Sequence, residues 1–83
     1  MDIRQVFAAN LRRLRHQKGL SQEDLAHSAD INRTYMSKLE TGISYPGLEI
    51  IGKLAAALDV EPAALLSLPA KRGVRKNKFK ALR

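Results

Sequence analysis

Residues Leu20 to Gly42 read LSQEDLAHSADINRTYMSKLETG, and this stretch decides how the rest of the chain is interpreted. Two short helical patterns lie on either side of Asp30-Ile31-Asn32, where the apolar period breaks. A connection of three or four residues between two short helices is typical of a tight helical pair whose members cross steeply. The stretch therefore predicts two helices joined by a tight turn.

Capping residues support both helices of this pair. Ser21 followed three residues later by Asp24 is a capping-box pattern at the start of the first helix. Asn32 is a favourable N-cap for a second helix from Arg33 to about Thr41. Gly42 suits the left-handed position that commonly follows a helix.

The second helix of the pair has an outer face made of hydrogen-bond donors. On a wheel of about 100° per residue, the inner side carries Tyr35, Met36 and Leu39, with the acid Glu40 at its edge. The opposite arc contains Arg33, Thr34, Ser37, Lys38 and Thr41. A solvated surface helix has the same pattern. Its place as the second helix of a tight pair favours a helix that enters the major groove of DNA, where Arg and hydroxyl groups contact base edges.

The flanking sequence predicts a small all-α bundle of about five short helices. Ile3, Phe7, Leu11 and Leu14 form one apolar stripe of a first helix that ends near Lys18 and Gly19. Leu48, Ile51, Leu54, Ala55 and Leu58 form the stripe of a fourth helix. Pro62 suits the first turn of a fifth helix that runs to about Leu66.

Composition limits the chain to one modest domain. A chain of 83 residues buries only roughly 60% of its unfolded surface. Hydrophobic residues make up 45% of the chain but aromatic residues only 5%, which favours a helical core of Leu, Ile and Ala over a β-sandwich. The chain contains no cysteine, which excludes disulfides and thiolate zinc sites. We expect a soluble, cytoplasmic protein associated with the nucleoid, without a signal peptide or membrane span.

The net charge of +7 is concentrated at the carboxyl end. Residues 1–68 hold eight basic and all eight acidic residues, so this part is formally neutral. The remaining bases lie in an acid-free tail, and they are Lys71, Arg72, Arg75, Lys76, Lys78, Lys80 and Arg83. We therefore expect a domain at 1–68, with its paired helices at 20–42, and a basic tail at 69–83. Strong positive charge favours an acidic partner such as nucleic acid.

Taken together, these motifs resemble the Cro and phage-repressor type of helix-turn-helix domain, the XRE-like family. The resemblance covers about residues 4 to 66 and rests on several motifs in order. They are Gly19-Leu20-Ser21-Gln22, the Leu25-Ala26 pair, the ending Tyr35 to Gly42, and Pro46 before the Leu-rich fourth helix. The run Arg33 to Gly42 looks in particular like the recognition helix of restriction-modification controller proteins. The family implies a homodimeric DNA-binding transcriptional regulator, often a repressor of its own promoter, that binds a pseudo-palindromic operator.

The resemblance also implies roles for single residues. The positions that match base-reading residues of the family are Arg33, Thr34, Ser37 and Lys38. Gln22 matches a residue that contacts the DNA backbone and braces the recognition helix; we add Asn32, Tyr35 and Thr41 as further backbone candidates. For Tyr35, a half-buried aromatic that closes the core is an equal alternative. Arg15 and Glu40 match a structural ion pair.

The chain departs from the family in two places. The loop after Gly42 usually carries Lys or Arg for phosphate contact, whereas here it reads Ile43-Ser44-Tyr45. This departure weakens the expected backbone contact on that side. The cap of the fourth helix is commonly Ser or Thr, and here it is Gly47, a tolerated N-cap.

Two segments near the carboxyl end have open alternatives. Leu65, Leu66 and Leu68 either complete the core or form a two-fold interface that places two half-sites about one helical turn apart. The tail is either a solvated terminus, a basic arm along DNA, or a segment that docks a protein partner through Val74, Phe79 and Leu82.

Enzymatic chemistry and cofactors are not expected. His16 and His27 have no metal-binding context, and no nucleophile grouping or phosphate-binding glycine loop is present, so neither a metal nor another cofactor is predicted. Two alternatives to the regulator remain. One is an antitoxin or adaptor with this DNA-binding domain and a protein-binding tail. The other is a non-specific nucleic-acid binder that depends on the tail.

Overall fold

Four α-helices and one short 3-10 helix follow one another in a computed structural model that describes residues 2–68. The elements are α1 (Ile3–Gln17), α2 (Gln22–Ala29), α3 (Arg33–Glu40), α4 (Leu48–Leu58) and the 3-10 helix η1 (Pro62–Leu65). No strand occurs within the described range. The predicted all-α class is confirmed, although the last element is a 3-10 turn rather than a fifth α-helix.

The helix ends are set by the residues that the sequence indicates. The Ser21 hydroxyl accepts from the Asp24 amide at 2.9 Å, and the Asp24 carboxylate accepts from the Ser21 amide at 3.2 Å, which completes the predicted capping box. Asn32 Oδ1 accepts from the Thr34 amide at 2.7 Å at the start of α3. Gly19 has φ +71° and Gly42 has φ +79°, the left-handed conformation expected after a helix.

The turn between α2 and α3 depends on one residue that the sequence pattern did not single out. Asp30 ends α2 with φ 58° and ψ 50°, and its amide donates to the carbonyls of Ala26 and His27. Aspartate tolerates the left-handed region better than most non-glycine residues. This conformation turns the chain sharply, so Asn32 can begin α3 two residues later.

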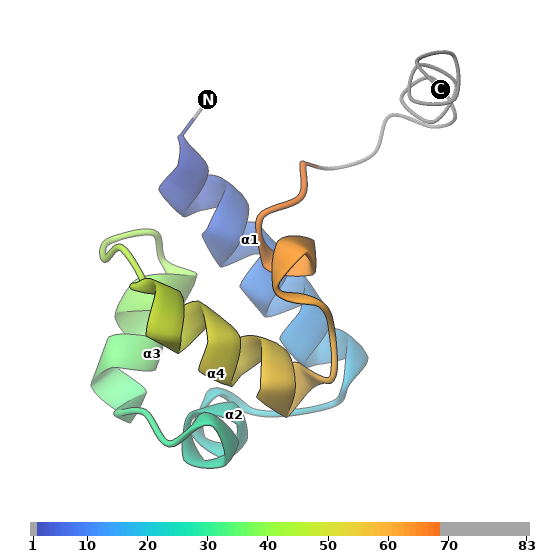
Figure 1. The fold of residues 1–83 in the computed structure, drawn as a ribbon. Coiled ribbons are helices and arrows are strands. Elements are labelled where there is room, and N and C mark those ends of the chain that lie inside the picture. Colours follow the sequence, from blue (N-terminus) through green and yellow to red (C-terminus); the bar gives the residue numbers. More distant parts are fainter. Residues whose placement is uncertain (1, 69–83) are drawn as a thin grey trace, which may run out of the picture.

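The core lies between α1, α3 and α4, with α2 and η1 closing its sides. α1 packs against α3 and η1, while α4 packs against α2 and η1 (Figure 1). The largest fully buried side chains come from all five elements, and they are Phe7, Leu11, Leu25, Met36, Leu39, Leu54, Leu58 and Leu65. At about 1.5 to 3 kcal/mol for each large apolar side chain, this burial is the main favourable term for folding.

In two of the predicted apolar stripes, the first residue is exposed rather than buried. Leu48 was predicted to face the core, but its side chain is 87% exposed. It is the first residue of α4, preceded by Gly47, and it lies at the edge of the stripe where no neighbouring element covers it. Ile3, the first residue of α1, is 43% exposed for the same reason. Neither side chain contributes to the buried core.

None of the helices in the described part is both long and apolar enough to cross a bilayer. The basic tail, with its predicted arm residues and its apolar side chains Val74, Phe79 and Leu82, lies outside the residues that the structure describes.

Candidate nucleic-acid interface

The outer face of α3 and the first turn of α2 share one open depression. It is lined by Gln22, Arg33, Thr34, Ser37 and Lys38. The structure thus brings together the four side chains predicted to read bases and the glutamine predicted to contact the backbone. Two of the lining residues are cations and none is an acid, so the depression favours an anionic ligand with exposed hydrogen-bonding groups.

The inner face of α3 fixes the direction of this outer face. Met36 and Leu39 are fully buried, and Glu40 is 2% exposed. The division of α3 into an outer polar arc and an inner face therefore agrees with the burial pattern. Because both apolar anchors are in the core, α3 cannot rotate without exposing them, and the outer side chains keep their orientation.

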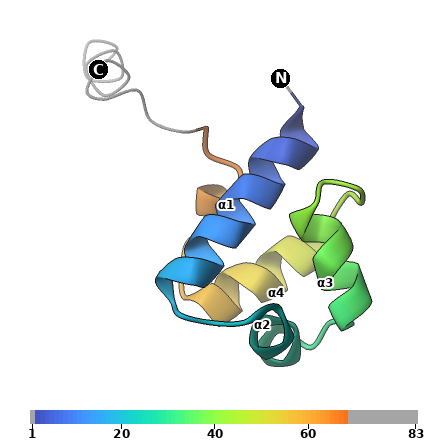
Figure 2. The same cartoon turned by 180° about the vertical axis from the view of Figure 1, so that it is seen from behind.

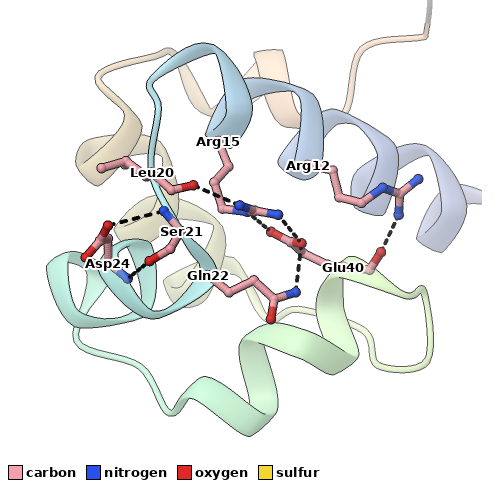
Figure 3. Close-up of polar contacts among 7 residues, drawn as sticks. All are labelled: Arg12, Arg15, Leu20, Ser21, Gln22, Asp24 and Glu40. Atoms are coloured by element: carbon pink, nitrogen blue, oxygen red, sulfur yellow. Dashed lines mark hydrogen bonds and ion pairs between the residues drawn. The ribbon is translucent and has the colours of Figure 1, made fainter.

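Glu40 is the centre of a polar network that joins three helices (Figure 3). Arg15 binds it side-on, with Nε donating to Oε2 at 2.6 Å and Nη2 donating to Oε1 at 3.0 Å. Gln22 Nε2 also donates to Oε1, at 3.0 Å. Arg15 Nη1 donates to the Leu20 carbonyl at 2.8 Å, and Arg12 donates to the Glu40 carbonyl. The structure thus contains the Arg15–Glu40 ion pair, with a bidentate geometry that favours it.

The Glu40 network also positions Gln22 at the start of α2. Because its amide nitrogen faces the Glu40 carboxylate, its carbonyl oxygen points away from Glu40 toward α3 (Figure 3). The backbone amides of Gln22 and Glu23 precede the first intrahelical bond, which runs from Leu25 to the Ser21 carbonyl. Two amide donors and the positive end of the helix dipole are therefore available for an anion beside the depression.

Three further backbone candidates differ in what their polar groups already do. Asn32 is exposed, and its Oδ1 caps α3. Tyr35 is half-buried against the core, and its hydroxyl donates to the Tyr45 carbonyl at 3.3 Å. The Thr41 hydroxyl donates to the Ser37 and Lys38 carbonyls at 3.1 and 3.2 Å. Since a hydroxyl has one hydrogen, the Tyr35 and Thr41 hydroxyls must each leave a protein carbonyl before they donate to a phosphate.

The leucines near the carboxyl end separate into two groups. Leu65 is fully buried in the core, so its predicted place in a two-fold interface is wrong. Leu66 and Leu68 are 40% and 44% exposed. Of these three leucines, Leu66 and Leu68 have apolar surface that a partner could cover.

Asn10 holds this carboxyl-terminal segment, and the sequence analysis did not identify this role. Its side chain is 5% exposed, and Nδ2 donates to the carbonyls of Leu65 at 2.9 Å and Ser67 at 2.8 Å. Its Oδ1 accepts from Arg13 Nη2 at 3.1 Å. A polar residue on the flank of an apolar stripe would have been the only indication, because the carbonyls it binds are more than fifty residues away.

A donor-rich helix face anchored by its apolar side, beside the free amides of a second helix, defines a helix-turn-helix DNA-binding domain. Among residues 2–68, no group of three or more His, Cys, Asp or Glu side chains is arranged to hold a metal ion. Residues 11–65 match the Helix-turn-helix family, and the chain belongs to this family. It is a DNA-binding transcription regulator of the XRE-like type, as the sequence motifs predicted.

Two curated relatives have names that describe regulators. The chain is 44% identical over 71 residues to the Neisseria hypothetical transcription factor of Neisseria meningitidis. This alignment covers 86% of this chain and 67% of that protein. It is 41% identical over 66 residues to the control protein C.BamHI of Bacillus amyloliquefaciens, which covers 78% of this chain and 82% of that protein.

Solved structures agree with this fold. The restriction-modification controller protein C.AhdI from Aeromonas hydrophila has a TM-score of 0.73 at 45% identity, covering 75% of this chain and 94% of that chain. The hypothetical transcription factor NHTF from Neisseria has a TM-score of 0.80 at 39% identity, and the match covers 96% of this chain and 85% of that chain.

Proposed function

We propose that this protein is a homodimeric, sequence-specific transcriptional repressor that reads a pseudo-palindromic operator with α3 in the major groove. The observation that carries the proposal is the shared depression of Gln22, Arg33, Thr34, Ser37 and Lys38. It combines side chains that discriminate bases with amides that hold a phosphate. The similarity to the restriction-modification controller protein C.AhdI supports a role in controlling a restriction-modification system. Repression of the protein's own promoter is what the resemblance in sequence implies.

The four outer residues of α3 would divide the reading of bases by their chemistry. Arg33, at the amino end of α3, is exposed and can donate two parallel hydrogen bonds to the O6 and N7 atoms of guanine. Thr34 and Ser37 have hydroxyls that both donate and accept, and the Thr34 methyl group can contact thymine. Lys38 is one turn further along α3 and can contact guanine or a phosphate.

Backbone contacts would fix the register of this helix. The free amides of Gln22 and Glu23 would receive one phosphate at the α2 end of the depression. Asn32 Nδ2 and the Tyr35 hydroxyl are further donors, although the hydroxyl must leave the Tyr45 carbonyl to bind DNA. Leu66 and Leu68 would form the apolar centre of the dimer contact.

The mechanism would be occupancy without covalent chemistry. A dimer that covers the promoter excludes polymerase, and we propose no enzymatic activity or cofactor. Such a regulator acts in the cytoplasm, on the DNA of the nucleoid.

Selection of bound duplexes from a random pool tests this proposal. We expect two half-sites in inverted orientation, about 10 base pairs apart from centre to centre. The Arg33→Ala variant should bind the selected duplex more weakly by about 1 to 3 kcal/mol and bind random DNA as before. Lys53→Ala, which removes a cation paired only with Glu49 on α4, is the charge control. Equal effects of Arg33→Ala on both duplexes would instead support a non-specific binder.

The basic tail supplies a separate proposal. Its seven cations without an acid would follow the DNA backbone and add affinity without sequence preference. Truncation after Ala70 should lower the magnitude of the log-log salt slope by about 0.9 for each lost contact. An unchanged slope rejects the arm. Co-purification of a stable protein that requires residues 70–83 would favour the antitoxin or adaptor alternative.

A further inference from the structure

We propose that Arg4, held on the ring of Tyr45, is the phosphate contact at the carboxyl end of the recognition helix α3. This inference rests on the proposed function, because it adds a second backbone contact to the same DNA interface. Arg4 lies in the first turn of α1, far in sequence from the helix pair.

Arg4 and Tyr45 bring three parts of the chain together. The Arg4 guanidinium carbon lies 4.6 Å from the centroid of the Tyr45 ring. The Tyr45 carbonyl accepts from the hydroxyl of Tyr35, which belongs to α3. In Figure 2 the first turn of α1 lies beside the loop that connects α3 to α4. The Arg4 cation therefore lies against the loop that follows α3.

A second contact fastens the same turn of α1 to the loop. Gly42 is buried, and a Cβ atom built there would overlap Nε2 and Cδ of Gln5. The Gln5 side chain thus covers the glycine that starts the loop. Because Gln5 follows Arg4 directly, this contact also holds Arg4 in place relative to the loop.

The loop itself has no cation, since it reads Ile43-Ser44-Tyr45. Several other bases of the body already have protein partners: Arg12, Arg13 and Arg15 donate to protein acceptors, and Lys53 pairs with Glu49. Arg4 also has an acidic neighbour, because its Nε lies 3.7 Å from Asp2 Oδ1, but this contact is an ion pair without a hydrogen bond. Its Nε is buried without a hydrogen-bond partner, and its side chain is 35% exposed.

The neighbour that competes for Arg4 is Asp2. Its Oδ1 lies 3.7 Å from Arg4 Nε and already accepts from the Arg4 amide at 3.0 Å as the cap of α1. An ion pair at this distance is weak, and because Nε itself is buried, the two terminal nitrogens of Arg4 are the groups left for a phosphate. Stacking on an aromatic ring restricts the guanidinium before DNA binds and leaves its edge for bidentate phosphate contact. Together with the α2 amides, Arg4 would hold the backbone at the second end of the reading face.

The salt dependence of binding tests this contact. Dissociation constants are measured across a salt series for the wild-type protein, Arg4→Ala and Arg4→Lys. The probes are a duplex selected by the wild type and a random duplex of equal length. We expect Arg4→Ala to lower the slope magnitude by about 0.9 for each bound protomer, with the preference between duplexes unchanged. Arg4→Lys keeps the charge and should keep most of the slope.

Two further variants separate this contact from general effects. Tyr45→Leu removes the ring but not the charge, so we expect weaker binding to both duplexes with a smaller change in slope than Arg4→Ala. Lys53→Ala should leave the slope as in the wild type. If Arg4→Ala lowers thermal stability but keeps the wild-type slope, Arg4 only braces the loop and the inference is wrong. If the wild type shows no preference between the duplexes, the proposed function fails independently of Arg4.

Discussion

Glu40 has the largest structural consequence of any single charged residue in the described domain. Its carboxylate is 2% exposed and receives three side-chain donors, two from Arg15 and one from Gln22. Burying two ions costs several kcal/mol each, so the pair as a whole contributes little net stability. Its structural effect is positional, because it ties α1 and the start of α2 to the end of α3.

Removal of Glu40 or Arg15 alone should therefore lower the free energy of unfolding far more than removal of both. We expect Glu40→Ala to lower the free energy of unfolding by about 3 to 5 kcal/mol, because the Arg15 cation stays buried without its acid. The double variant Arg15→Met with Glu40→Leu should recover part of this loss. Urea denaturation measures the free energy of unfolding of each variant, analysed with one m-value for all of them. A double variant as unstable as Glu40→Ala would contradict this account.

Residue roles could be predicted only where a local pattern or a family motif marks them. Ser21, Asn32 and Gly42 were found because capping and left-handed positions depend on neighbours in sequence. The hydrogen bond of the Thr41 hydroxyl to the Ser37 carbonyl could not be predicted, because the helical wheel does not show it. Asn10 was missed because its partners are contributed by the other end of the chain.

At the scale of elements, helix positions followed from apolar periodicity, and the errors lie at helix ends. Leu48 fits the period of α4 but not its burial, since the first turn projects beyond the neighbouring helices. The segment after Pro62 forms a 3-10 turn that is too short to have an apolar face of its own. Its position is set instead by Leu65 in the core and by the Asn10 bonds from α1.

This dependence of η1 on α1 gives a testable expectation for Asn10. Asn10→Leu keeps the side-chain volume but leaves the Leu65 and Ser67 carbonyls without their donor, which should destabilise the fold by about 1 to 3 kcal/mol. Release of this segment should also weaken self-association, measured by sedimentation. Arg13→Ala is the matched control, because it removes the third bond of Asn10 and keeps both carbonyl bonds. Equal losses in both variants would show that the carbonyl bonds do not hold the segment.

At the scale of the molecule, attraction to DNA and discrimination between DNA sequences depend on different features. The part of the chain up to residue 68 is formally neutral, so long-range attraction to DNA must depend on where cations are placed rather than on their number. Arg33 and Lys38 line the depression on α3, and Arg4 lies over the ring of Tyr45 in the loop after α3. A domain without net charge should discriminate between DNA sequences through α3. It should need two copies to bind DNA with high affinity.

The dimer contact decides whether two copies can act together. Leu66→Glu with Leu68→Glu places charges in the proposed interface, and we expect monomers in sedimentation and a loss of about 10² to 10⁴-fold in affinity for the selected full site. Affinity for an isolated half-site should not change, because α3 is untouched. Leu48→Glu is the control, since Leu48 is a more exposed leucine outside the proposed interface. If Leu48→Glu instead yields monomers and the double variant remains dimeric, the two-fold interface lies at the start of α4.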